Sequence, residues 1–396
     1  MTPDPAHAFV PYPEVSVDHA TQGPLAGLSF GVKDLFDVAG YPTGCGNPIM
    51  LACSGIKTRH AEVVGQLLAA GARFVGKCHT EEFAYSVIGS NPHFATPRNA
   101  AAPERYTGGS SSGSASAVGH RLCDFALGTD TAGSVRVPAS HCGLFGMRPT
   151  PGRTSLAGCH PLAPGFDTCG FFTRDLDTFA QVLAVLDRAP ARELPERPRI
   201  GVVRDAWALC VPQAARAYEP ARTALLRILQ DLGAVIDDVD IALDDFGAMT
   251  DAMRDLPAYE AWQINGPLIE RHAIPMGDGV RQRHFHGRDL DPQALAAARA
   301  YRQRFVAHMD ALLGSDRVLL MPTVPAPSPR RDEADQAALD AYRWRVIALT
   351  AAASLAGCPQ LSLPLAGCDG GPMGISLLGP RDTDQALVAL ARRLVS

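Results

Sequence analysis

The sequence lacks several features that would direct a chain to a membrane or a nucleic acid. No uninterrupted apolar run approaches the roughly 18 residues that a membrane span needs. Residues 1–5 lack the basic and apolar regions of a secretory signal peptide. The formal net charge of −5 does not favour binding to nucleic acid or to an anionic membrane. We therefore expect a cytoplasmic protein with neither kind of partner.

Cysteine and histidine groups of the kind that hold metals are also missing. The ten cysteines are spread along the chain without a Cys-x-x-Cys pair, which favours reduced, mostly buried thiols over disulfides or a zinc site. His284 and His286 form one close pair, but arginines surround them and no nearby carboxylate or cysteine completes a ligand set. We expect neither a metal nor a cofactor.

What is present is the composition and the patterning of a globular α/β protein. Hydrophobic residues make up 46% of the 396 residues and charged residues 19%, which is typical of a chain with a substantial core. Residues 28–33 and 74–76 read as strands on either side of a helix at 60–70, which predicts a right-handed crossover in a largely parallel sheet. Further strands are expected near 124–128, 200–203, 318–323, 360–364 and 374–378.

Two glycine-framed serine clusters carry the chemistry. They read Gly108-Gly-Ser-Ser-Ser-Gly-Ser114 and Gly128-Thr-Asp-Thr-Ala-Gly-Ser-Val-Arg136. Serines between glycines can present a hydroxyl beside bare backbone N–H groups, which acyl transfer needs. The first cluster also matches the G-x-S-x-G elbow of α/β-hydrolases, but no apolar strand precedes it. It lacks the lysine of a phosphate-binding loop, and it leads into a predicted helix at 115–122 rather than a flexible tether.

Both clusters resemble those of the amidase signature family. That family has a Gly-Gly-Ser-Ser-Gly-Gly-type loop followed by a Gly-Thr-Asp-x-Gly-Gly-Ser-x-Arg segment. The continuation at 138–153 and the upstream Val32-Lys33-Asp34 fit as well. The resemblance implies one α/β domain over 1–396, with a mixed, mostly parallel central sheet flanked by helices. Its signature core would span 25–187, the proline-rich stretch 188–199 would be a linker, and 200–396 would complete the sheet and the substrate pocket.

The resemblance also implies roles for individual residues. Ser134 matches the acylated nucleophile, Ser110 the bridging serine on a cis peptide bond, and Lys33 the buried base. A lysine can act as a base only when neutral, and burial favours its neutral form. The implied oxyanion hole consists of the backbone N–H groups of Thr131, Ala132, Gly133 and Ser134. Supporting hydrogen bonds are implied for Ser111, Asp130 and Arg136. Ala132 and Ser112 stand where the family usually has glycine.

Within the family, the chain is most similar to the compact indole-3-acetamide hydrolase type, through residues 40–48, 82–86 and 166–170. That implies a small primary amide, with an aromatic or apolar acyl part, as the substrate. The aromatic candidates for the pocket wall are Tyr85, Phe166, Tyr259 and Trp262. Three alternatives stay open: a hydrolase of ureide- or biuret-like C–N bonds, which would need a cationic or polar pocket; an amidotransferase subunit; and a non-catalytic docking domain. A homodimer is also left open.

Overall fold

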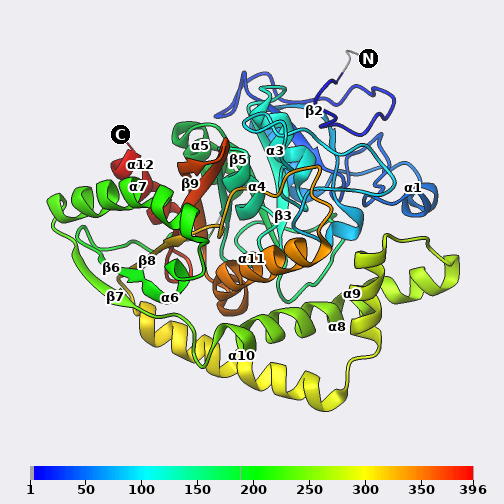
Figure 1. Ribbon diagram of the computed structural model, residues 1–396. Coiled ribbons are helices and arrows are strands. Elements are labelled where there is room, and N and C mark those ends of the chain that lie inside the picture. Colours follow the sequence, from blue (N-terminus) through cyan, green and yellow to red (C-terminus); the bar gives the residue numbers. More distant parts are fainter. Residues whose placement is uncertain (1–3, 188, 396) are drawn as a thin grey trace.

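The computed structural model describes residues 4–187 and 189–395. In this part of the chain ten strands form one continuous sheet, with helices on both of its faces (Figure 1). The strand order is β2-β1-β3-β5-β4-β9-β10-β8-β6-β7. The strands are β1 (Ser29–Lys33), β2 (Arg73–Cys78), β3 (Phe125–Asp130), β4 (Phe145–Arg148), β5 (Thr168–Thr173), β6 (Arg199–Val203), β7 (Val235–Val239), β8 (Arg317–Pro322), β9 (Gln360–Cys368) and β10 (Gly371–Leu378).

The sheet is parallel at its two ends and antiparallel in its centre. Strands β2, β1 and β3 run parallel, which confirms the predicted crossover, and β8, β6 and β7 are parallel as well. The pairings from β3 through β5, β4, β9 and β10 to β8 are all antiparallel. The expected mixed sheet is confirmed, but its antiparallel pairings outnumber the parallel ones, so the expectation that it is mostly parallel is corrected. Its centre contains the β9–β10 hairpin, whose short connection allows only antiparallel neighbours.

Strands from both sides of the proline-rich stretch share this sheet. Strand β9 pairs with β4, so a strand from the last tenth of the chain lies beside one that follows the serine clusters.

The described helices are α1 (Pro48–Ser54), α2 (Glu62–Ala69), the 3₁₀ turn η1 (Glu82–Ala84), α3 (Ser112–Gly119), α4 (Arg136–His141), α5 (Leu176–Leu186), α6 (Arg204–Trp207), α7 (Pro212–Asp231), α8 (Phe246–His272), α9 (Asp278–Arg288), α10 (Pro292–Leu313), α11 (Gln336–Ala356) and α12 (Asp384–Val395).

Strand β3 shows how the two faces of the sheet are covered. Phe125 and Leu127 pack into the core that includes α2 and α5, whereas Ala126 packs against α3. Successive side chains of a strand point to opposite faces, so α3 and the α2–α5 pair lie on different sides of the sheet. The first serine cluster leads into α3 and the second follows from β3, and the serines of both are at most 4% exposed.

One predicted helix start is displaced. Helix α3 begins at Ser112 rather than near Ala115, because the serines of the first cluster enter the helix directly. Helix α5 is capped by Asp175, whose carboxylate accepts a hydrogen bond from the Thr178 N–H at 2.7 Å, and Asp177 adds a favourable negative charge in its first turn.

A separate helical layer covers one side of the sheet. Helices α8 and α10, green and yellow in Figure 1, lie outermost, with the orange α11 between them and the strands. Leu349 of α11 belongs to the same buried cluster as Met253 of α8, Phe305 of α10 and Met321 of β8. This layer brings side chains from the second half of the chain over the serine loops.

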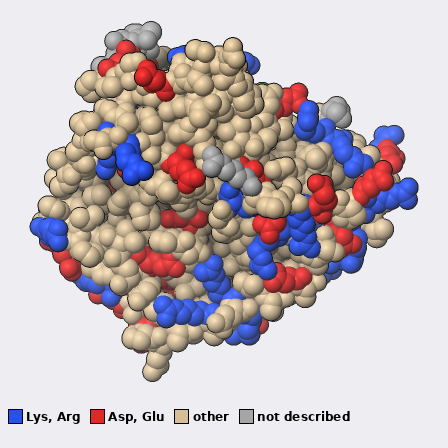
Figure 2. All heavy atoms as spheres, turned by 180° about the vertical axis from the view of Figure 1, so that it is seen from behind, with Lys and Arg blue, Asp and Glu red and all other residues tan. Residues whose placement is uncertain are grey.

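The surface visible in Figure 2 has no region of a single charge sign, and the cysteines form no disulfides among the described residues. On the face shown in Figure 2, basic and acidic side chains are interspersed. None of the described helices combines the length and apolar character that a membrane crossing requires. All ten cysteines are free thiols and most are buried, as predicted.

Candidate active site

Lys33 ends strand β1 with its side chain fully buried. Its Nζ lies 2.8 Å from the Ser110 Oγ and 2.7 Å from the Thr129 Oγ1. Because β1 pairs with β3, the end of β1 is brought beside Thr129, which the sequence analysis did not identify. Thr129 belongs to the second serine cluster, between Gly128 and Asp130, but its sequence position alone did not indicate a role.

The loop that carries Ser110 is tightly enclosed. The Gly109–Ser110 peptide bond is cis, as the resemblance implied. A Cβ on Gly109 would lie 2.0 Å from the Glu81 Oε2, so no larger residue fits there without displacing Glu81. The Ser110 carbonyl accepts hydrogen bonds from the Glu81 N–H and the Thr80 hydroxyl, each at 3.1 Å. The loop is thus held from the β2 side as well as by Lys33.

The loop that carries Ser134 wraps around the carboxylate of Asp130. Asp130 accepts hydrogen bonds from the N–H groups of Gly133 at 2.8 Å, Val135 at 3.1 Å and Arg136 at 3.2 Å. Gly133 itself adopts φ 121°, a conformation that favours glycine. The N–H of Ser111 donates to the Ser134 carbonyl at 3.3 Å, which joins the two serine loops.

These bonds correct part of the predicted oxyanion hole. The Gly133 N–H donates to Asp130 and is not available to a substrate oxygen. The N–H groups of Thr131, Ala132 and Ser134 donate to no residue in the described part of the chain. The sequence could not show this, because it depends on how the turn curls around Asp130. Three of the four predicted donors therefore remain free.

Two buried arginines, Arg136 and Arg148, form hydrogen bonds that hold the loop of Ser134 in place. The Arg136 guanidinium donates to Asp130 at 2.8 Å and to the backbone carbonyl of Thr350 at 2.8 Å. Arg148, which the sequence analysis did not assign, donates to the Asp130 backbone carbonyl at 2.5 Å. Burial alone would raise the pKa of Asp130, but the two guanidiniums hold that pKa well below its usual range. Asp130 therefore stays ionised and keeps the loop closed around it.

Burial also sets the charge of Lys33. It lowers the pKa of the Lys33 amine from 10.5 to about 8, although Cys159 and the carboxylates of Glu81, Asp167 and Asp130 act in the opposite direction. With that pKa, about a tenth of the molecules carry a neutral lysine at pH 7, against less than about a thousandth for an ordinary lysine. The neutral amine needed for a base is therefore present at physiological pH.

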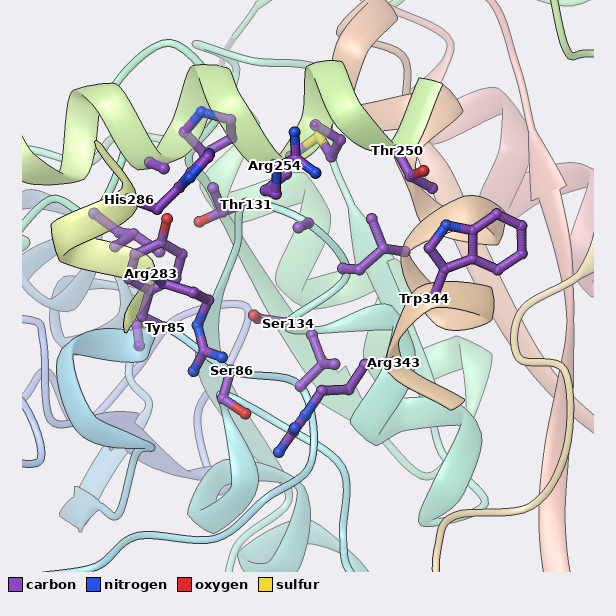
Figure 3. A pocket seen from close by; sticks show the side chains of 18 of the residues that line it. Tyr85, Ser86, Thr131, Ser134, Thr250, Arg254, Arg283, His286, Arg343 and Trp344 are labelled. Atoms are coloured by element: carbon purple, nitrogen blue, oxygen red, sulfur yellow. The ribbon is translucent and has the colours of Figure 1, made fainter. Parts of the chain in front are cut away.

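A cavity of about 400 Å³ opens in front of Ser134 (Figure 3). Thr131 and Ala132 line it beside the serine, and Tyr85 comes from the turn that follows η1. Most of the remaining wall comes from α8, α9 and α11, and it includes three arginines, Arg254, Arg283 and Arg343. Its size is in the range of small-molecule sites.

Tyr85 is the one predicted aromatic residue that lines this cavity. Phe166 lies outside the lining, buried at 1% exposure with the guanidinium of Arg302 4.1 Å above its ring. Tyr259 and Trp262 are also outside it, since both turn away on α8: Tyr259 lies under Arg299, and Trp262 packs edge-on against Phe285. The predicted aromatic wall is thus corrected, since α8 presents a different face to the serines. The wall is largely aliphatic, its aromatic residues are Tyr85 and Trp344, and three arginines add positive charge.

Two histidines singled out from the sequence have structural partners. The His284 ring packs edge-on against Phe83 and Tyr85 and hydrogen bonds to the Val280 carbonyl at 3.0 Å. His286 lies 2.7 Å from the Asp255 carboxylate. Residues 4–187 and 189–395 contain no group of three or more His, Cys, Asp or Glu side chains placed to hold a metal ion.

The chain is similar to known proteins over most of its length. The family model described as Amidase matches residues 13–388. Amidase 1 of Arabidopsis thaliana is 35% identical over 418 residues, which cover 98% of this chain and 98% of that protein. A crystal structure of an amidase superposes with a TM-score of 0.81 at 31% identity, covering 94% of this chain and 85% of the other. An allophanate hydrolase of Kluyveromyces lactis gives 0.83 at 26% identity, covering 94% and 62%.

Proposed function

The chain belongs to the amidase family and is an amide-hydrolysing enzyme, and we propose that it converts a small primary carboxamide to its acid and ammonia through an acyl-enzyme on Ser134. The observation that carries this proposal is the buried contact between the Lys33 amine and the Ser110 hydroxyl, on a loop that is hydrogen bonded to the loop of Ser134, which lines a cavity.

The proposed reaction starts with proton transfer through the two serines. Neutral Lys33 accepts the Ser110 proton while Ser110 takes the proton of the Ser134 hydroxyl, and the Ser134 oxygen attacks the amide carbon. The N–H groups of Thr131, Ala132 and Ser134 donate to the oxyanion, and each is worth about 3 kcal/mol when well aimed. Lys33 returns its proton through Ser110 to the leaving nitrogen, so ammonia departs. Water then attacks the acyl-enzyme by the same relay and regenerates Ser134.

A panel of amides tests the proposal. Ammonia release is measured with indole-3-acetamide, phenylacetamide, aliphatic primary amides and ureido acids. Ser134→Ala is expected to abolish turnover and the acyl adduct seen by mass spectrometry after acid quench. Lys33→Ala is expected to lower turnover by at least about 10³-fold with the fold intact, because the base is lost. A Lys33→Ala enzyme with near-normal rates would exclude the relay.

A second candidate is hydrolysis of a ureide-like C–N bond. It is favoured by the arginines in the cavity wall, since ureido acids carry a carboxylate, and by the similarity to an allophanate hydrolase. Turnover of ureido acids in the panel, without turnover of simple carboxamides, would replace the first candidate with this one.

A further inference from the structure

Arg283, on α9, has an unusual environment within the cavity. Its guanidinium makes no hydrogen bond or ion pair with any described residue, and its Nε is buried without a partner. The contact it does make is with the ring of Tyr85, whose centroid lies 5.3 Å away. The Arg283 side chain is only half-buried, but charges withdrawn from water are normally paired, so an unpaired guanidinium in a cavity wall is available to an anionic ligand.

Arg343, on α11, places a second positive charge in the same cavity. Its Nη1 donates to the Asp340 carboxylate at 2.7 Å, but its Nε is buried without a partner. Burial lowers the pKa of the Arg283 guanidinium and the positive charge of Arg343 acts in the same direction, while Tyr85, Glu81 and Asp340 act against it. Figure 3 shows both guanidiniums reaching toward Ser86 on the side of the cavity where Ser134 lies.

The other charges of the cavity wall neutralise one another. Arg254 is paired with Asp251 and Asp255, each at 2.8 Å, and His286 binds Asp255 as well. Arg343 is likewise paired with Asp340, so among the described residues of the wall the arginine without an ion-pair partner is Arg283.

Glu81, behind the Ser110 loop, makes no direct contact with this guanidinium. It shares no hydrogen bond or ion pair with Arg283 in the described residues, and one of its oxygens accepts from the Ser90 N–H at 3.2 Å. Burial raises the pKa of Glu81, and the positive charge of Arg283 partly opposes that shift.

We propose that Arg283, assisted by Arg343, binds a carboxylate of the substrate, so that the amide hydrolysed at Ser134 belongs to an acyl group that is itself an anion. The class of substrate is the monoamide of a short dicarboxylic acid. A guanidinium fork matches the two oxygens of a carboxylate, and such charge-assisted pairs are the strong hydrogen bonds of binding sites. Ser134 and Arg283 line one cavity of about 400 Å³, so a small molecule reaches both. This inference rests on the proposed function and narrows its substrate.

Matched pairs of substrates test the charge alone. Succinamate, glutaramate and adipamate are compared with butanamide, pentanamide and hexanamide, in which a methyl group replaces the carboxylate. The wild-type enzyme is expected to prefer at least one anionic amide over its neutral partner by about tenfold or more in kcat/KM. Faster turnover of the neutral member of every pair, or of indole-3-acetamide over all the anionic amides, would overturn the inference and leave the proposed function standing.

Variants then locate the anchor. Arg283→Gln is expected to lower the anionic-to-neutral ratio of kcat/KM by about 10- to 100-fold, mainly through KM. Arg343→Gln is expected to lower it less, because Asp340 already engages that side chain. Arg281→Gln is the control: it removes the same charge from the same helix, but its side chain is exposed and paired with Asp278. A ratio that is unchanged in Arg283→Gln would refute the assignment.

Calorimetry separates this inference from the proposed function. Glutaramate is titrated into Ser134→Ala and into Ser134→Ala with Arg283→Gln. Binding to the first that weakens about tenfold or more in the second supports the carboxylate anchor, even if no amide in the panel is turned over. Equal binding to both proteins, or none to either, refutes it.

Discussion

The hydroxyl of Thr129 offers a sharp test of how Lys33 works. The Lys33 Nζ donates to the Thr129 Oγ1 at 2.7 Å and lies 2.8 Å from the Ser110 Oγ. A neutral amine has two N–H groups and one lone pair, so a donor bond to Thr129 directs the lone pair toward Ser110. Thr129→Val keeps the shape but removes the acceptor, and the site is too buried for water to replace it readily.

The sign and size of the effect follow from the charge state. A hydrogen bond from an ammonium is about twice as strong as one from a neutral amine, so the protonated form loses about 1 kcal/mol more than the neutral form. Since one pKa unit is about 1.4 kcal/mol, the pKa of Lys33 is expected to fall by about 0.5 to 1 unit. That pKa starts from about 8, and the rate rises as the amine loses its proton, so the acid limb moves to lower pH.

The assay is kcat/KM for ammonia release between about pH 6 and about pH 10, because this ratio reports the ionisation of the free enzyme. On the plateau above about pH 9, kcat/KM of Thr129→Val is expected to be about tenfold lower than that of the wild type, because the amine has lost the bond that orients it. Thr173→Val is the control, because that buried hydroxyl donates to the Asp175 carbonyl, away from Lys33. An acid limb that stays in place or moves to higher pH would refute this account of Thr129.

Two further predictions concern stability. Asp130→Asn is expected to lower the free energy of unfolding by about 3–5 kcal/mol in urea denaturation, because it leaves buried guanidiniums uncompensated. Asp310→Asn breaks an exposed pair with Arg381 and should cost less than about 1 kcal/mol; equal costs would contradict the argument. Gly113→Ala is expected to lower the melting temperature strongly, since the new Cβ would lie 2.4 Å from the backbone of Ala8. In Gly65→Ala, within helix α2, the new Cβ has no neighbouring atom within 4 Å. This substitution should instead raise the free energy of unfolding by about 0.5–1 kcal/mol, which calorimetry can check.

The serine clusters were predictable because their information is local. The glycines and serines of 108–114 and 128–136 are contiguous, and the strand-helix-strand pattern that places Lys33 beside them is close in sequence. Hydrophobic periodicity therefore sufficed for β1, α2, β2 and β3. Thr129 was inside a recognised cluster, and only the pairing of β1 with β3 shows that its hydroxyl meets the lysine.

The cavity wall was not predictable in the same way. Arg281 and Arg283 are two positions apart in an arginine-rich stretch, and only the packing of α9 exposes one and turns the other into the cavity. Aromatic residues such as Trp262 were reasonable pocket candidates, but on α8 that ring packs against Phe285 instead. Likewise, the antiparallel centre of the sheet depends on where β9 and β10 insert, which local patterns do not encode.

Arg136 connects the beginning of the site to the end of the chain. Its guanidinium donates to the Thr350 carbonyl and the Gln360 side chain, which lie 214 and 224 positions further along. A ribosome delivers the nucleophile long before it delivers these acceptors, and domains fold as units during synthesis. The Ser134 loop therefore gains its full set of hydrogen bonds only after residue 360 has been synthesised.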